Sequence, residues 1–386
     1  MVFLKINIEN FDEIKKQMLK SENYLADYAT KSHDAIRLKP IKSDIRLEYE
    51  HDADKIIHSL SYTRYIDKTQ VYSDRLDDNI SKRMTHVQFV SRTSRTIARA
   101  LGLNEDLCEA ISLGHDIGHV PYAHEGEKFL NEISKKNLNE IFAHNVQSVR
   151  NFMLIEKNGE GLNLTIQTLD GMLCHNGEML SNVYEPKIKS LDEFINEYNQ
   201  CYIDEDTLKT LRPMTIEGCI VRISDIIGYI GKDIEDSILL GLFNRNMIPK
   251  DISDVLGNTN EEIMNTVILD IIENSYSKKY IKMSNNVFEA LNKLKKFNYQ
   301  NIYSKSLTKQ NDEKIKKMFY DLFYYYLDVL ENKNIKSDIY KVFLNNMNKK
   351  YIQKTSNKRM IIDYIAGMTD RYMESMYEVN ILKDGR

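Results

Sequence analysis

The chain has 386 residues, of which 42% are hydrophobic and 28% are charged, and its formal net charge is −4 at pH 7. This composition is typical of a soluble globular protein large enough for one big domain or two closely packed ones. The negative charge argues against a dedicated nucleic-acid binder, and the absence of an apolar run of about 20 residues argues against a membrane-spanning helix.

The termini and cysteines predict a cytoplasmic protein. The N-terminus has polar residues within its short apolar stretch and lacks a small-residue cleavage site, so no signal peptide is expected. No two cysteines have CxxC spacing, which favours buried thiols over a zinc site or disulfides. The four are Cys108, Cys174, Cys201 and Cys219.

The scarcity of helix breakers predicts an all-α fold. The chain has only five prolines and fifteen glycines, and it shows no Gly/Ser linker and no internal repeat. We therefore expect an N-terminal segment at 1–45, a helical core at 46–243 with a polar insertion at 176–212, and a helical region at 244–386 packed on the core.

The first elements follow from local patterns. Residues 12–28 can form a helix, and 52–72 are expected to form a helix that leads into a loop near 68–70. The segment 84–101 carries an apolar stripe at helical spacing and should end at Gly102, a favourable C-cap. Asn104 is then the expected N-cap of a helix that leads to His115 and Asp116.

Further helices are expected along the rest of the core. Gly118 and Pro121 should end the preceding helix, and a new one should begin near His124. A helix should cover 142–153, and an apolar helix should end near 175. Residues 214–240 carry isoleucines at helical spacing around Asp225, with Tyr229 one turn later. From about residue 244 onward, the chain reads as helix rich in lysine and aromatic residues.

The segment His115-Asp116-Ile117-Gly118-His119 predicts a metal site. Three histidines, an aspartate and two glutamates fall within thirteen residues here. With His86 upstream and Asp225 downstream, His115 and Asp116 complete a set of two imidazoles and two carboxylates. This set leaves coordination positions open for water and a phosphate oxygen. This mixed set suits Mn²⁺, Fe²⁺, Co²⁺ or Ni²⁺ and tolerates Mg²⁺ less well.

Asp225 taken alone would be interpreted as a structural ion pair or as part of an exposed helix face. A carboxylate among isoleucines needs a partner, however, because an unpaired buried charge costs several kcal/mol. Beside His86 and the His115-Asp116 pair, metal ligation becomes the better interpretation.

Proton transfer is predicted from the histidine-rich stretch 86–175, which holds six of the nine histidines. His124 and Glu127 are three residues apart, so on a helix they can orient each other. They form a candidate proton-transfer pair, and His144 is a second candidate. Each of these histidines alone would be dismissed as an ordinary polar residue.

Arg83 is the preferred phosphate contact because it shares a helix face with His86. A solvated helix face explains the other arginines of this helix. No P-loop, dinucleotide-binding or nucleophile-elbow motif occurs. Lysine-rich stretches at 293–296 and 314–317 suggest nucleic-acid binding only as a secondary possibility, since a solvated face explains them better.

Longer blocks of the sequence resemble the deoxynucleoside triphosphate triphosphohydrolases, the dGTPase branch of the HD superfamily of metal-dependent phosphohydrolases. The blocks keep the order and spacing of that family across roughly 45–245 and 358–373. They include Ile56-Ile57-His58-Ser59, Lys68-Thr69-Gln70-Val71, Arg83-Met84-Thr85-His86, Gly114 to His119, Phe142-Ala143-His144-Asn145, and Tyr364 to Tyr372.

The resemblance implies an all-α HD-domain core and hydrolysis of a deoxynucleoside triphosphate (dNTP) to a deoxynucleoside and tripolyphosphate. It implies a divalent metal, Mn²⁺ first, on His86, His115, Asp116 and Asp225. It implies catalytic roles for His124, Glu127 and His144, and substrate contacts from Gln70, Arg64, Arg83, His119, Tyr229, Lys232 and Asp233.

The resemblance also implies a homo-oligomer built from dimers and a possible activating nucleotide at a second site. The enzymatic alternatives are other HD phosphohydrolases: a 5′-nucleotidase, a cyclic-nucleotide phosphodiesterase or a guanosine tetraphosphate hydrolase. The non-enzymatic alternative is a regulator that binds nucleotides or nucleic acid.

Overall fold

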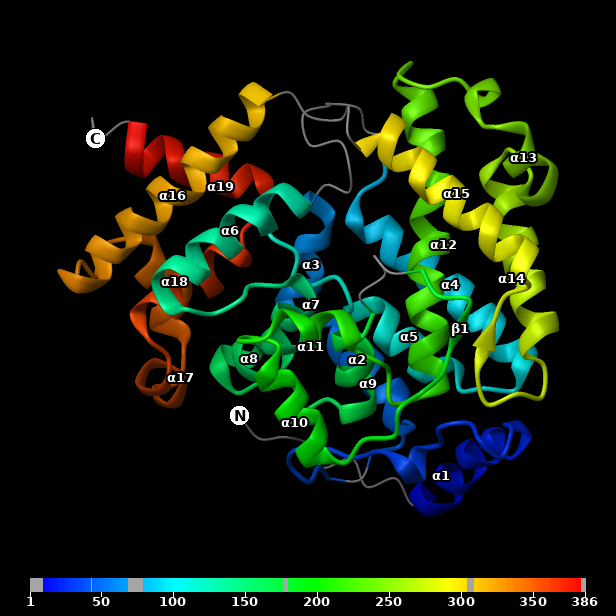
Figure 1. Cartoon of the computed structure of the whole chain (residues 1–386). Helices are drawn as coiled ribbons and strands as arrows, with labels where there is room; N and C mark the ends of the chain where they lie inside the picture. Colours follow the sequence, from blue (N-terminus) through cyan, green and yellow to red (C-terminus); the bar gives the residue numbers. More distant parts are fainter. Residues whose placement is uncertain (1–9, 43, 69–78, 176–179, 304–308, 383–386) are drawn as a thin grey trace.

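The protein is described here by a computed structural model covering residues 10–42, 44–68, 79–175, 180–303 and 309–382. Helices make up nearly all of its regular structure, which confirms the predicted all-α class (Figure 1). Within the described residues, strands β1 (Val183–Tyr184) and β2 (Ile281–Lys282) form one small antiparallel ladder that pairs Val183 with Lys282. No described helix has the length and apolar character needed to cross a membrane.

The N-terminal half contains nine α-helices within the described residues, most of them short. They are α1 (Phe11–Leu19), α2 (Glu48–Ile57), α3 (Leu60–Thr63), α4 (Arg83–Leu101), α5 (Glu105–Gly114), α6 (Ala123–Leu138), α7 (His144–Arg150), α8 (Glu156–Gly159) and α9 (Ile166–Leu173).

The second half begins with two small helices and the long α12, and it continues with two groups of helices. They are α10 (Leu191–Gln200), α11 (Glu205–Thr210), α12 (Ile216–Leu239), α13 (Lys250–Leu256), α14 (Asn260–Ser275), α15 (Asn285–Asn301), α16 (Lys309–Glu331), α17 (Lys349–Lys354), α18 (Asn357–Ala366) and α19 (Asp370–Tyr377).

Local signals explain where the central helices begin and end. Gly102 ends α4 at φ 70°, in the left-handed region that glycine adopts without strain. The Asn104 side chain accepts hydrogen bonds from the amides of Asp106 and Leu107, as expected of an N-cap. The helix predicted at 52–72 is interrupted, because Ser59 caps a new short helix after α2 ends at Ile57.

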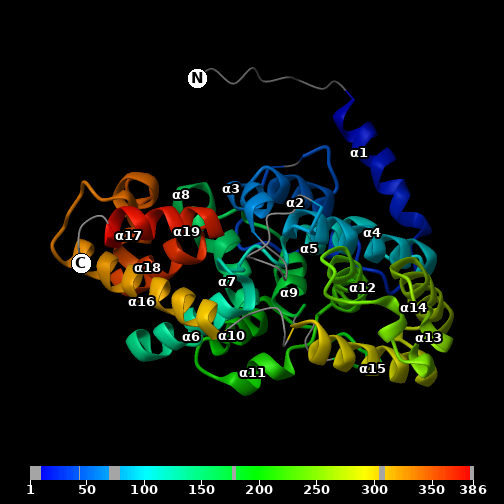
Figure 2. The same cartoon turned by 90° about the horizontal axis from the view of Figure 1, so that it is seen from above.

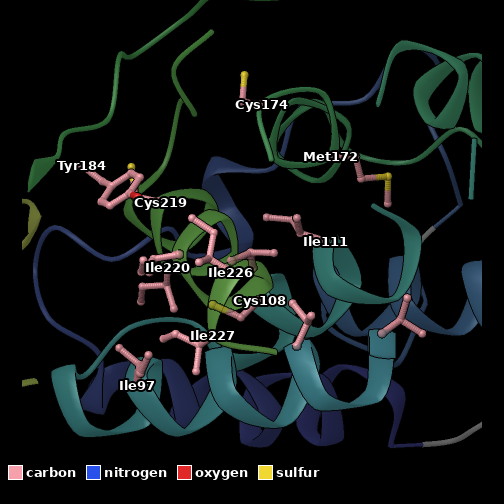
Figure 3. Packing of buried hydrophobic residues seen from close by; sticks show 14 of the residues in the cluster. Ile97, Cys108, Ile111, Met172, Cys174, Tyr184, Cys219, Ile220, Ile226 and Ile227 are labelled. Carbon is pink, nitrogen blue, oxygen red and sulfur yellow. The ribbon is translucent and has the colours of Figure 1, made fainter. Parts of the chain in front are cut away.

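One apolar cluster holds α4, α5, α9 and α12 together. Figure 3 shows side chains of these helices meeting at its centre: Ile97, Cys108, Ile111, Met172, Ile220, Ile226 and Ile227. All four cysteines are free and buried, as expected from their spacing. The cluster continues through α13, α14 and α15 as far as Ile302.

A second apolar cluster joins α6 to the C-terminal helices α16, α18 and α19. Phe129 and Leu130 of α6 pack there with Phe319 and Ile361. Figures 1 and 2 both show α16 to α19 gathered beside α6, on the opposite side of the molecule from α13 to α15. Helices α7 and α9 therefore lie between the two groups of C-terminal helices, α16 to α19 and α13 to α15 (Figure 1).

Candidate metal centre and active site

Three central helices bring the predicted metal ligands together. His86 lies on α4, His115 and Asp116 follow the end of α5, and Asp225 lies on α12. His86 Nε2 is 3.0 Å from Asp225 Oδ1 and 3.7 Å from Asp116 Oδ2, and His115 Nε2 is 3.6 Å from Asp225 Oδ1. All four side chains are buried. They form a compact cluster of two imidazoles and two carboxylates.

The backbone around His115 orients its imidazole toward this cluster. Nδ1 of His115 is 2.7 Å from the Ser112 carbonyl, which can only accept, so Nδ1 donates there and Nε2 is the ring nitrogen that faces the cluster. The next turn requires glycine at 118, because a Cβ there would lie 2.0 Å from the His144 carbonyl oxygen. Ser148 fixes the turn by accepting from the Gly118 amide at 2.9 Å and donating to the His115 carbonyl at 2.6 Å.

The cluster has the chemistry of a divalent cation site. His115 Nε2 is buried without a hydrogen-bond partner among the described residues. Burial lowers the pKa of His115, but the carboxylates of Asp116 and Asp225 outweigh it and raise that pKa to about 9. Burial raises the pKa values of both carboxyls, but His115, with His119 and Arg83 at Asp116 and with His86 at Asp225, outweighs it and holds both pKa values low. A bound cation would replace the protons that balance these carboxylates.

Arg83 lies one turn before His86 and donates a hydrogen bond to Asp116 Oδ2 in a buried ion pair. This contact orients Asp116 and leaves its Oδ1 3.4 Å from His115 Nε2. The structure therefore places Arg83 directly against the cluster of candidate metal ligands.

A second chain of groups runs from Glu127 through His144 to His175. His144 Nδ1 is 3.0 Å from both Glu127 oxygens, and His144 Nε2 is 3.1 Å from His175 Nε2. His175 Nδ1 is 2.5 Å from the Met172 carbonyl, so it donates there and its Nε2 must accept. His144 Nε2 is then the donor to His175, and His144 Nδ1 donates to Glu127.

His175 is a site residue that the sequence did not single out. Burial, reinforced by His115 and His144, lowers the pKa of His175 to about 3. Its Nε2 is 3.7 Å from Asp116 Oδ1, so it links the Glu127–His144 chain to the metal centre. Its position at the end of the histidine-rich stretch 86–175 was the one available signal.

His119 and His124 lie on the other side of His144. The His119 and His144 ring centroids are 3.9 Å apart, and His119 Nδ1 is 3.2 Å from Asp116 Oδ1. His124 Nδ1 is 3.7 Å from Glu127 Oε2, and its side chain is 63% exposed. Glu127 thus lies between a buried histidine and an open one.

The predicted sugar and phosphate contacts of α12 extend from the metal centre along one side of the helix. Tyr229 is partly buried, and Lys232 Nζ is held by Asp236 Oδ1 at 2.6 Å. Asp233 is buried and accepts a hydrogen bond of 2.6 Å from the Tyr303 hydroxyl. Burial raises the pKa of Asp233 to about 7.

The other two predicted substrate contacts are Gln70 and Arg64. Gln70 falls outside the described residues. Arg64 lies in the wall of a separate cavity, where its guanidinium donates to Ser61 Oγ at 2.7 Å.

Comparisons with known proteins identify the family of the chain. Residues 83–229 match the HD domain family, and residues 281–379 match the phosphohydrolase-associated domain. The first match begins at Arg83 and spans all four residues of the metal cluster. The fold and this family match therefore identify the class of protein as the HD-domain phosphohydrolases, which are hydrolases.

Relatives over nearly the whole chain narrow this class. The chain is 35% identical over 359 residues to the deoxyguanosinetriphosphate triphosphohydrolase-like protein of Caldanaerobacter subterraneus, covering 92% of this chain and 91% of the relative. The Clostridium tetani protein of the same description is 36% identical, covering 96% and 93%. The Rickettsia prowazekii protein is 31% identical, covering 88% and 93%. The chain belongs to this deoxyguanosinetriphosphate triphosphohydrolase-like family.

Proposed function

We propose that the protein hydrolyses deoxynucleoside triphosphates to a deoxynucleoside and tripolyphosphate. The main support is the juxtaposition of the His86, His115, Asp116 and Asp225 cluster with the Glu127–His144 pair. The names of the relatives agree with this reaction class.

The four clustered residues would hold a divalent cation, with Mn²⁺ favoured by the mixed nitrogen and oxygen donors and Mg²⁺, Co²⁺, Fe²⁺ or Ni²⁺ as alternatives. Such an ion polarises a phosphoryl oxygen and lowers the pKa of bound water. Arg83 keeps Asp116 in place and presents positive charge beside the cluster.

Proton transfer would use the groups around Glu127. His144 holds protons on Nδ1 and Nε2 while Glu127 is ionised, and it supplies positive charge and a donor toward the phosphates. The exposed His124 can exchange a proton with the substrate, since Glu127 lies close enough to stabilise its charged form. His119 would contact the phosphates from its position beside the His144 ring.

Substrate selection would use α12 and the segment around Gln70. Tyr229 would crowd a ribose 2′-hydroxyl, and Asp233 would accept a hydrogen bond from the 3′-hydroxyl. Arg64 and Lys232 are weaker phosphate candidates, because one lines another cavity and the other is paired with Asp236. We further propose a cytoplasmic homo-oligomer built from dimers, with an activating nucleotide as a possible partner and nucleic acid as a secondary one.

The test is product analysis. Purified, metal-quantified protein is incubated with each dNTP and NTP in the presence of Mn²⁺ or Mg²⁺, singly and in mixtures. We expect deoxynucleoside and intact tripolyphosphate, and turnover only in mixtures would indicate nucleotide activation. Release of orthophosphate or pyrophosphate, or no dNTP turnover with the metal bound, would contradict the proposal and favour another phosphoester substrate.

A further inference from the structure

The turn that joins His119 to His124 has a strained backbone. Tyr122 and Ala123 have φ of 60° and 49°, so two adjacent residues with a Cβ adopt the left-handed conformation at the start of α6. Non-glycine residues rarely adopt this conformation, and they keep it only where the surrounding structure holds them. Because Ala123 immediately precedes His124, its backbone sets the direction in which the His124 side chain leaves the helix.

The side chains of this turn pack among the C-terminal helices. Val120 and Tyr122 belong to the apolar cluster of α6, α16, α18 and α19, together with Met373 of α19. The turn also lies tightly on α6, since a Cβ on Gly126 would be 1.9 Å from the Pro121 carbonyl oxygen. The conformation of the turn therefore depends on helices that carry none of the four clustered metal ligands.

Helix α19 holds Tyr122 at both its backbone and its side chain. Asp370 Oδ1 accepts a hydrogen bond of 3.0 Å from the Tyr122 amide, and Glu374 Oε1 accepts one of 2.9 Å from the Tyr122 hydroxyl. Asp370 and Glu374 are four residues apart on α19, so one face of the helix presents both carboxylates. Hydrogen bonds to carboxylates are stronger than those between neutral groups, so these two can hold an unfavourable backbone conformation.

Lys68 attaches the other end of the turn to the same part of the molecule. Its buried ammonium group donates to the His119 carbonyl and to the carbonyl of Ala366, at the end of α18. The segment 119–122 is therefore held at its first residue by a cation and at its last residue by a carboxylate.

These contacts involve a part of the sequence to which the proposed reaction gives no role. Residues 364–372 form the C-terminal block of the resemblance, but none of them belongs to the metal cluster or to the predicted substrate contacts. Ala366 and Asp370 lie in this block, and Glu374 follows it by two residues. The block thus reaches the catalytic site through the turn that precedes His124.

We propose that helix α19 positions His124 for the reaction, because its carboxylates Asp370 and Glu374 hold the preceding turn in the left-handed conformation. In this arrangement His124 Nδ1 lies 3.7 Å from Glu127 Oε2. Asp370 and Glu374 act as positioning residues, through Tyr122. The inference rests on the role of His124 in the proposed function, but the hold on the turn can be measured without turnover.

Amide hydrogen exchange on the full-length, manganese-loaded protein measures this hold directly. Asp370→Ala removes the acceptor of the Tyr122 amide, so exchange in the peptide 119–127 should quicken at least tenfold while α4 is unchanged. The control Glu378→Ala, which removes an exposed carboxylate just after α19, should leave exchange unchanged. Equal exchange in Asp370→Ala and the wild type would overturn the proposal, whether or not the protein hydrolyses a dNTP.

Kinetics on the dNTP that the wild type hydrolyses fastest test the effect on the reaction. Asp370→Ala should lower kcat at least tenfold and change KM by less than about threefold, because only the proton-transfer group is displaced. Adding Ala123→Gly to Asp370→Ala should raise kcat again at least threefold, since glycine adopts the left-handed backbone without strain. No recovery in the double variant, or a loss confined to KM, would overturn the proposal.

Tyr122→Phe covers the case in which Asp370→Ala does not fold. It removes only the hydroxyl that donates to Glu374, and the ring stays in the apolar cluster. We expect exchange in the peptide 119–127 to quicken and kcat to fall by about threefold each, the usual effect of losing one hydrogen bond, with bound manganese unchanged. Wild-type values of both quantities would overturn the role of α19.

Discussion

The cluster of candidate metal ligands and the separate cavity lined by Arg64, Lys55 and Asp363 differ in how their charged groups are paired. In the cluster of candidate metal ligands, both carboxylates lie against imidazoles, and Asp116 also pairs with Arg83. The four side chains of this cluster are buried. In the cavity, Asp54 and Asp363 are paired with arginines, whereas Lys55, Arg64 and Lys157 line the wall without a hydrogen bond to a carboxylate among the described residues. The comparison shows that two imidazoles and two carboxylates gathered in one compact buried cluster suit a cation, whereas charged groups paired one to one along a cavity wall do not form such a site.

His115→Ala gives the largest expected effect and tests the metal side of this contrast. Several kcal/mol of transition-state stabilisation should disappear, which corresponds to a loss of at least about a thousandfold in kcat. Activity and bound metal are measured together, with His33→Ala, an exposed histidine, as the control. Near-normal turnover with the metal bound would contradict the assignment of His115 as a metal ligand.

Asp363→Ala tests the junction between the two regions. It leaves the buried Arg150 without its bidentate partner and Tyr351 without its acceptor, so the free energy of unfolding should fall by about 3–5 kcal/mol. Urea denaturation measures this loss, and Asp328→Ala on α16 is the exposed control. A change below about 1 kcal/mol would show that the junction does not depend on this ion pair.

Glu127→Gln tests the proton-transfer chain beside the metal. It keeps the size of the side chain but removes the charge that orients His144, so kcat should fall about a hundredfold while metal content is unchanged. Glu132→Gln on the same helix, in an exposed pair with Lys316, is the matched control. An equal and small loss in both variants would make Glu127 a structural residue only.

We expect the smallest effect from Asp233→Asn, which should change how the free energy of unfolding depends on pH. The pKa of Asp233 in the folded protein, about 7, lies above its ordinary value of 3.8. The contribution of this carboxyl group to the free energy of unfolding is therefore complete below pH 3.8 and is lost as the pH rises through 7. Asp233→Asn should flatten this decline by at most about 1.4 kcal/mol for each pH unit. Unfolding midpoints at pH 5, 6 and 7 measure it, with the exposed Asp251→Asn as control; parallel curves would contradict the raised pKa.

Local pattern alone determined a large part of this protein. The helix 84–101 with its Gly102 terminus, the Asn104 cap and the helix around Asp225 follow from periodicity and capping, which act over a few residues. The His-Asp segment predicted a metal cluster because those side chains have few other uses at such density.

Only the tertiary structure decided which distant groups meet. The sequence paired His124 with Glu127 from their spacing, whereas the fold also brings His144 to Glu127 and His175 to His144. The resemblance grouped Arg64 with the substrate contacts, whereas the fold places it in the wall of a separate cavity. Helical spacing reports neighbours within one helix, but contacts between helices depend on packing angles and on the turn at Gly118, which the whole core imposes.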